Sequence, residues 1–195
     1  MIRVQARTEP STLMTFASPF LAIVLTLIFG SILFTALDKD PIQALHVLLV
    51  LPLSDAYNIS EMLVKMGPLL LCAVGLSLCY RANMWNIGAE GQLLAGALGG
   101  SAVALMFVDS ESFMAMPLTL LGGILSGMAW AAIPTYLKVK FNSNLILTTI
   151  MLNYIALYLL IWAVHGPLRD PDGFGFPESA LFSDATLLPV LSDSG

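Results

Sequence analysis

The sequence predicts an all-α integral membrane protein, a polytopic helix bundle with about five transmembrane helices. The chain of 195 residues is 57% hydrophobic and only 11% charged, whereas an ordinary soluble domain is roughly a quarter charged. Apolar runs of about 20 residues recur along it, and each is long enough to cross a bilayer. No run of basic residues is present, so nucleic acid is not an expected partner.

The apolar runs are separated by charged or proline-containing segments, and these set the predicted boundaries. Residues 42–60 are half apolar but interrupted by Pro52, so we expect an interfacial or partly inserted helix followed by a loop. Residues 165–195 are polar and acidic, and we expect an external loop there. The predicted spans are residues 16–37, 61–80, 87–108, 113–137 and 145–164, with one helix broken or re-entrant near 81–92.

The distribution of charge predicts the orientation of the chain in the membrane. With a cytoplasmic N-terminus, the outside segments hold eleven of the thirteen acidic residues, all except Glu9 and Glu90. The inside segments then hold five of the eight basic residues, which are Arg3, Arg7, Arg81, Lys138 and Lys140. The positive-inside rule therefore favours a multi-pass plasma-membrane protein whose N-terminus is cytoplasmic.

A polar segment, residues 81–92 with the sequence RANMWNIGAEGQ, interrupts the long apolar region between residues 63 and 108. Ionisable and amide side chains at membrane depth cost on the order of a few kcal/mol each, so they are rarely without a role. Counted from Leu93 to Val108, the third span has only 16 residues, about 24 Å of helix against a hydrocarbon core of roughly 30 Å. The span must therefore begin near Ile87, which places Glu90 and Gln92 in its first turns.

Two interpretations of this segment remain open. In the first, Asn86 caps the third span and Arg81 forms a structural ion pair with Glu90. In the second, the segment caps the helix and also lies on a substrate path, because a simple cap needs only one polar residue.

Small residues recur at helical spacing in the third and fourth spans. Gly96 and Gly100 are four residues apart, as are Gly123 and Gly127. Such rows let helices approach closely in a membrane. We therefore expect these four glycines to mediate helix packing.

An amide side chain lies in the middle of the fifth span. Thr149 and Asn153 are one turn apart on the same helical face. A mid-membrane amide needs either a partner on another helix or a water-filled cavity. Interhelical hydrogen bonding and a pore-lining role for Asn153 both remain open.

The motifs that would indicate an enzyme are not found in this sequence. It contains no phosphate-binding Gly-Lys-Ser/Thr loop, no His-Glu-x-x-His zinc motif and no Gly-x-Ser-x-Gly nucleophile motif. We expect no cofactor, no metal and no catalytic residue. If energy drives this protein, another subunit supplies it.

Three segments together resemble a known family. The sequence NIGAEGQ at residues 86–92, preceded by Arg81-Ala82, resembles the signature of permease subunits of ABC importers for nucleosides and simple sugars. Residues 149–156 and residues 165–178 are similar to the span and the external loop that follow in that family. Two departures stand out: Asn83 occupies a position where the family often has glycine, and Leu145 one where it often has glutamate.

The resemblance implies a transport subunit without its own ATPase site, acting on a nucleoside or simple sugar. Its implied partners are a cytoplasmic ATP-binding subunit, a second permease subunit, an extracytoplasmic solute-binding protein and the lipid bilayer. The polar side chains on the path would bind substrate weakly, because tight binding prevents release. The implied path residues are Asn83, Asn86, Glu90, Gln92 and Asn153. Because permeases of this family are about twice as long, residues 1–195 are expected to be a partial transmembrane permease domain from the N-terminal portion.

A second hypothesis is a secondary transporter or channel in which Glu90 is a proton or cation site, because broken helices with polar segments occur there too. A third, an intramembrane enzyme or a structural subunit, is weaker, because no nucleophile–base or metal pair is visible. Dependence of uptake on an ATPase and a binding protein separates the first hypothesis from the second.

Overall fold

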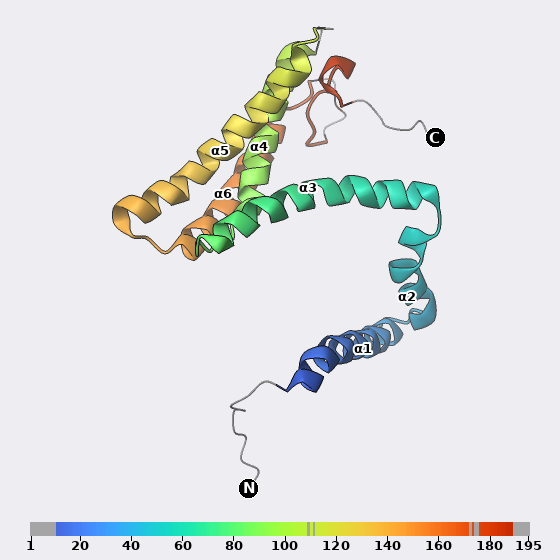
Figure 1. Cartoon of the computed structure of the whole chain (residues 1–195). Coiled ribbons are helices and arrows are strands. Elements are labelled where there is room, and N and C mark those ends of the chain that lie inside the picture. The colour runs from blue at the N-terminus through green and yellow to red at the C-terminus, as the bar shows by residue number, and fades with distance from the viewer. Residues whose placement is uncertain (1–10, 109, 111, 172, 174–175, 189–195) are drawn as a thin grey trace. The chain divides into compact units, whose positions relative to one another are not determined.

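The computed structural model describes residues 11–108, 110, 112–171, 173 and 176–188, and it is built from helices there (Figure 1). The β-structure in the described residues is a single isolated bridge between Arg169 and Ser179. Five helices are long and apolar enough to cross a membrane. The predicted fold class, an all-α protein with about five spans, is confirmed. The chain forms two compact units, Met1–Met66 and Gly67–Gly195.

The first unit contains α1 (Thr12–Ala36), α2 (Pro41–Leu49), a 3-10 helix (Leu51–Leu53) and the start of α3. The carboxylate of Asp40 caps α2, accepting hydrogen bonds from the backbone N–H of Ile42 at 2.8 Å and of Gln43 at 3.3 Å. The segment 42–60 thus contains a short helix followed by a turn, and α3 begins earlier than residue 61.

Helix α3 (Ala56–Arg81) runs from the first unit into the second and ends in a Schellman motif. The N–H of Asn83 donates to Tyr80 O at 3.0 Å and that of Met84 donates to Cys79 O at 2.9 Å. These bonds require a left-handed residue after the helix, and Asn83 has φ 56°. Asparagine tolerates this conformation better than other residues with a Cβ.

The second unit is arranged around α4 (Ala89–Ala104), which continues into a 3-10 helix (Leu105–Phe107). Helix α4 packs against α5 (Ala115–Phe141) and, less extensively, against α6 (Leu145–His165), as Figure 1 shows. A last 3-10 helix (Asp184–Thr186) lies beside α5. The predicted span 113–137 thus continues to Phe141, where Asn142 ends α5 in a left-handed conformation with φ 49°.

The contact between α4 and α5 depends on glycines. A Cβ built on Gly96 would lie 3.2 Å from Gly123 O, and one built on Gly123 would lie 3.3 Å from Gly96 O. A Cβ on Gly99 would lie 2.7 Å from Ser126 Oγ, which itself donates to Ala95 O at 2.7 Å. The two backbones therefore approach closely at this crossing. Gly100 and Gly127, the other predicted packing residues, lie on the same contact.

Candidate functional site

The connecting segment, residues 82–88, joins α3 to α4 and contains the first part of the predicted polar segment. Here Asn86 Oδ1 accepts a hydrogen bond from Gly88 N at 2.8 Å, which makes a tight Asx turn before the helix. The N-cap of α4 is Gly88, and α4 begins at Ala89. The prediction that Asn86 caps this helix was wrong, because its side chain stabilises the preceding turn instead.

The first turn of α4 obtains its capping groups from α6. Asn153 Oδ1 accepts from Gly91 N at 2.9 Å, and Asn153 Nδ2 donates to Ile87 O at 3.0 Å. Thr149 Oγ1, from a side chain that is 1% exposed, accepts from Ile87 N at 3.3 Å. Backbone groups that a helix start leaves unpaired are thus satisfied by a neighbouring helix. Of the two interpretations of Asn153, these bonds favour interhelical hydrogen bonding.

Two glycines make this capping possible. A Cβ on Gly88 would lie 2.9 Å from Thr149 Cβ, and a Cβ on Gly91 would lie 2.7 Å from Asn153 Oδ1. Any larger residue at either position would push α6 away from the start of α4. The role of Gly88 and Gly91 cannot be read from the sequence, because it depends on side chains of α6 that lie about 60 residues further along the chain.

The structure does not bring Arg81 and Glu90 together. Both side chains are exposed, and the salt bridge that forms within residues 11–108, 112–171 and 176–188 joins Glu61 and Lys65 at 3.5 Å. Glu90 lies in the first turn of α4, where the helix dipole stabilises a carboxylate without a basic partner. The predicted structural ion pair is therefore absent from this arrangement.

Glu90 and Gln92 face different sides of α4. They are two residues apart, which separates their directions by about 200° around a helix. Glu90 lines a cavity of about 400 Å³ beside α6, together with Asn153 and Tyr154. Gln92 faces α3 and α5. Two residues that are adjacent in the predicted path thus lie on opposite sides of the helix.

The Gln92 side of α4 is hollowed. One cavity of about 450 Å³ runs between α3, α4 and α5 from Asn86 to Gln92. A second, of about 560 Å³, shares Gln92, Leu93, Leu71 and Ile124 with the first and continues along α4 as far as residues 182–186. Because the cavities share these residues, we treat them as one groove, the long groove. It is lined mainly by small and aliphatic residues, and Gly96, Gly100, Ala104, Phe182 and Thr186 carry it to its far end.

Polar groups are spaced along the long groove. Asn86 lies at one end and Gln92 lies where the two cavities meet. Thr119 lines the second cavity, and its Oγ1 is buried with no hydrogen-bond partner among the described residues. Gln92 forms no side-chain hydrogen bond within the described part of the chain. The arrangement offers a ligand widely spaced polar groups on an apolar surface.

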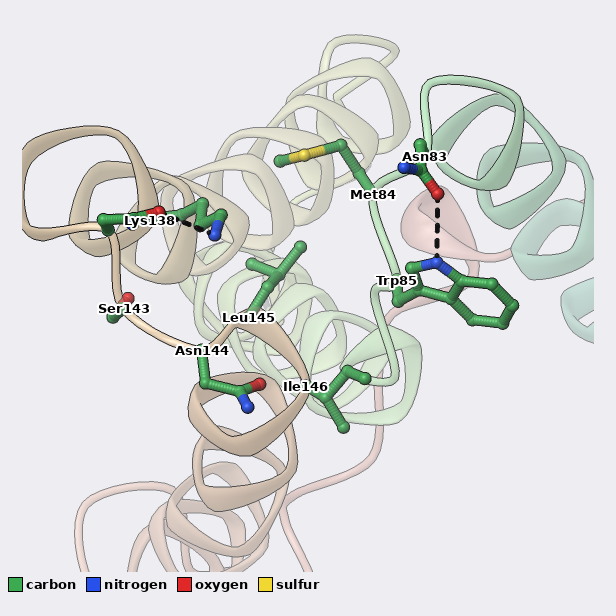
Figure 2. A pocket seen from close by; sticks show the side chains of 9 residues that line it. Asn83, Met84, Trp85, Lys138, Ser143, Asn144, Leu145 and Ile146 are labelled. Carbon is green, nitrogen blue, oxygen red and sulfur yellow. Dashed lines mark hydrogen bonds between the residues drawn. The ribbon is translucent and has the colours of Figure 1, made fainter.

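The remaining path residue, Asn83, faces a third cavity, of about 350 Å³ (Figure 2). It lies beside Trp85, whose Nε1 donates to Asn83 Oδ1 at 3.2 Å. The five predicted path residues are therefore distributed over three cavities. Asn86 and Gln92 line the long groove. Glu90 and Asn153 line the cavity of about 400 Å³ beside α6, and Asn83 lines the third cavity.

No metal-binding cluster is found in the part of the chain that the structure describes. No group of three or more His, Cys, Asp or Glu side chains is placed to hold an ion there. The two cysteines, Cys72 and Cys79, are free and line the α3 wall of the long groove.

The sequence is similar to a known protein family and to several curated proteins. Residues 58–194 match a family model described as the permease component of a branched-chain amino acid transport system. The chain is 38% identical to a glucose ABC transporter permease protein of Haloferax volcanii, over 95% of this chain and 48% of that protein. It is 34% identical to a nucleoside ABC transporter permease protein of Lactococcus lactis, over 75% of this chain and 40% of that protein.

A third relative is a guanosine ABC transporter permease protein of Bacillus subtilis, 29% identical over 78% of this chain and 43% of that protein. The chain spans about half the length of the curated relatives it matches. No solved structure gives a significant match.

Proposed function

Because this chain belongs to the family of branched-chain amino acid transport system permease components, we propose that the permease containing this sequence serves an ABC-type importer of a nucleoside or simple sugar. Relatives named as glucose, nucleoside and guanosine permeases support this substrate class. Its partners would be a cytoplasmic ATP-binding subunit, a second permease subunit and an extracytoplasmic solute-binding protein. The ATP-binding subunit would supply the energy for transport. It would lie in the plasma membrane with its N-terminus in the cytoplasm.

The long groove is the observation that carries this proposal at the level of the site. It follows the same face of α4 from the connecting segment to residues 182–186, and it exposes Asn86 and Gln92 to a ligand. A simple sugar carries hydroxyl groups, and a nucleoside adds the polar edge of its base; amide side chains can bind such groups one or two at a time. Binding of this kind is weak enough to allow release, as a translocation path requires.

The other predicted path residues have different positions in this proposal. Asn153 holds the start of α4 in place through Ile87 and Gly91 and so positions Gln92 without contacting the substrate. Glu90 and Asn83 face separate cavities and lie off the path. The alternative, a secondary transporter with a proton or cation site at Glu90, requires the path to follow the opposite face of α4.

Uptake by reconstituted vesicles tests the proposal. Vesicles containing the permease together with its second permease subunit would be supplied with labelled nucleoside or glucose, with and without the ATP-binding subunit and the solute-binding protein. The proposal predicts uptake only when ATP and both partner proteins are present. Uptake by the permease alone, driven by a proton gradient and abolished by Glu90→Gln, would instead establish the secondary transporter.

A further inference from the structure

The third cavity, outside the proposed transport path, lies between the connecting segment and the turn that joins α5 to α6 (Figure 2). Its volume is about 350 Å³. One wall is formed by residues 83–85, a second by Lys138 near the end of α5, and a third by residues 142–146. The lining contains a lysine, three asparagines and a serine, and it contains no carboxylate.

Several hydrogen-bond donors of the polar side chains in this cavity have no acceptor among the described residues. Lys138 Nζ donates to Asn142 Oδ1 at 3.0 Å, and an ammonium group has two further hydrogens. Because the Oδ1 atoms of Asn142 and Asn83 accept from Lys138 and Trp85, the Nδ2 groups of both asparagines remain available to donate. The cavity therefore presents one positive charge and two amide donors.

The start of α6 adds backbone donors. Asn144 is its N-cap, and the side chain of Asn144 accepts from Leu147 N at 3.2 Å. The N–H groups of Leu145 and Ile146, both in the cavity lining, have no acceptor within the described residues. Unpaired N–H groups at a helix start favour an anion, and the helix dipole acts in the same direction.

Ser143 supplies an independent indication of a ligand. Ser143 lines the cavity, and its Oγ is buried with no hydrogen-bond partner among the described residues. Buried hydroxyls in proteins are nearly always hydrogen-bonded. An anion seated between Lys138 and the start of α6 would provide the acceptor that Ser143 lacks.

We propose that this cavity binds a phosphate group, carried either by an anionic phospholipid or by a soluble phosphate. The oxygens of a phosphate match a lysine, amide N–H groups, backbone N–H groups and a hydroxyl. Basic pockets at the ends of membrane helices bind anionic headgroups in this way. Trp85 lies exposed at the cavity edge, as aromatic residues at membrane interfaces do. The proposal does not depend on the transported substrate.

Native mass spectrometry of the purified chain in nonionic detergent tests this site. Phosphatidylglycerol, phosphatidylcholine and inorganic phosphate would be added separately, and bound molecules and the thermal unfolding midpoint would be measured. We expect phosphatidylglycerol or inorganic phosphate to bind and raise the midpoint, and Lys138→Ala to weaken binding by about fivefold, the factor for one basic residue near an anionic lipid surface. Retention of phosphatidylglycerol alone identifies a lipid headgroup, and an equal effect of inorganic phosphate identifies a soluble source.

Three variants control this experiment. Lys140→Ala removes a neighbouring charge whose Nζ lies over the Tyr136 ring, 5.8 Å from its centroid, and which does not line the cavity. Its binding should be unchanged, and Lys138→Arg should retain binding because the charge is kept. Ser143→Ala removes only the buried hydroxyl, and it should weaken binding even if Lys138→Ala fails to fold. Equal binding by the wild type and Ser143→Ala, or an equal loss in Lys140→Ala and Lys138→Ala, would overturn the proposal.

Discussion

Helix α4 is held on two sides by different chemistry. Its contact with α5 is a close approach of the two backbones, which is possible because Gly96 and Gly123 have no side chains. Its contact with α6 consists of hydrogen bonds, because Asn153 and Thr149 of α6 bind backbone groups at the start of α4. Lipid and aliphatic side chains are equally apolar, so helices in a membrane associate through close packing and hydrogen bonds. The two contacts represent these two solutions on one helix.

The difference predicts how each contact fails. Where the two backbones are closest, at Gly99, the glycine contact has no room for an added methyl group, so alanine there destabilises it. The capping contact loses only the hydrogen bonds that a substitution removes, so its losses are smaller and graded. Three pairs of substitutions test this distinction.

The largest effect is expected at Gly99. A Cβ there would lie 2.7 Å from Ser126 Oγ and 2.9 Å from Gly122 O, closer than real contacts allow. Gly99→Ala should lower the free energy of unfolding by about 2 kcal/mol through overpacking. The measurement is unfolding in mixed detergent micelles as SDS is added.

Gly100→Ala is the matched control for this prediction. The nearest atom to a Cβ at Gly100 is Thr119 O at 3.5 Å, which is an ordinary contact. Alanine also favours the helix, so the change in stability should be within about 0.5 kcal/mol of zero. If both variants lose the same stability, the α4–α5 contact is not limited by close packing.

The next effect is expected at Asn153. Asn153→Leu removes both of its hydrogen bonds and leaves Gly91 N–H and Ile87 O unpaired, at a cost of about 1–2 kcal/mol. Asn153→Asp keeps an acceptor for Gly91 N–H and loses the donor to Ile87 O. In the same unfolding assay the leucine variant should therefore lose stability, and hydrogen exchange at Gly91 should rise more in Asn153→Leu than in Asn153→Asp. Unchanged exchange at Gly91 in the leucine variant would contradict the capping role.

The smallest effect is expected at Thr149. Its hydroxyl accepts from Ile87 N at 3.3 Å, whereas the hydroxyl of the adjacent Thr148 bonds only to carbonyls of the first turn of its own helix. Thr149→Val should cost about 0.5–1 kcal/mol, the contribution of one interhelical hydrogen bond. Thr148→Val should cost less in the same assay, and a larger loss in Thr148→Val would contradict the account.

The glycine contact was visible in the sequence and the capping contact was not. Rows of glycine at helical spacing indicate a close contact whichever helix lies opposite, so Gly96, Gly100, Gly123 and Gly127 could be named in advance. An asparagine in a span indicates only that some partner exists. The partners of Asn153 are backbone groups 62 and 66 residues away, and no pattern in the sequence links them.

Helix count and approximate boundaries followed from apolar run length, because a bilayer sets a minimum length for a span. The detail of the polar segment did not follow. The family resemblance implies one path for Glu90 and Gln92, yet a separation of two residues places side chains on opposite faces of a helix. For Asn83, the structure explains a feature that the sequence already showed, its departure from the glycine common in the family. Its φ of 56° gives a physical reason why glycine suits that position and why asparagine is tolerated there.

The central claim is that substrate follows the long groove on the Gln92 side of α4 and not the Glu90 side. Thiol-labelling rates of Gln92→Cys and Glu90→Cys test it most directly, each in the complete transporter with Cys72→Ala and Cys79→Ala to remove the native thiols of the groove. The account predicts that a transported nucleoside or sugar slows labelling at Gln92→Cys and leaves the rate at Glu90→Cys unchanged. Protection at Glu90→Cys, with none at Gln92→Cys, would contradict it.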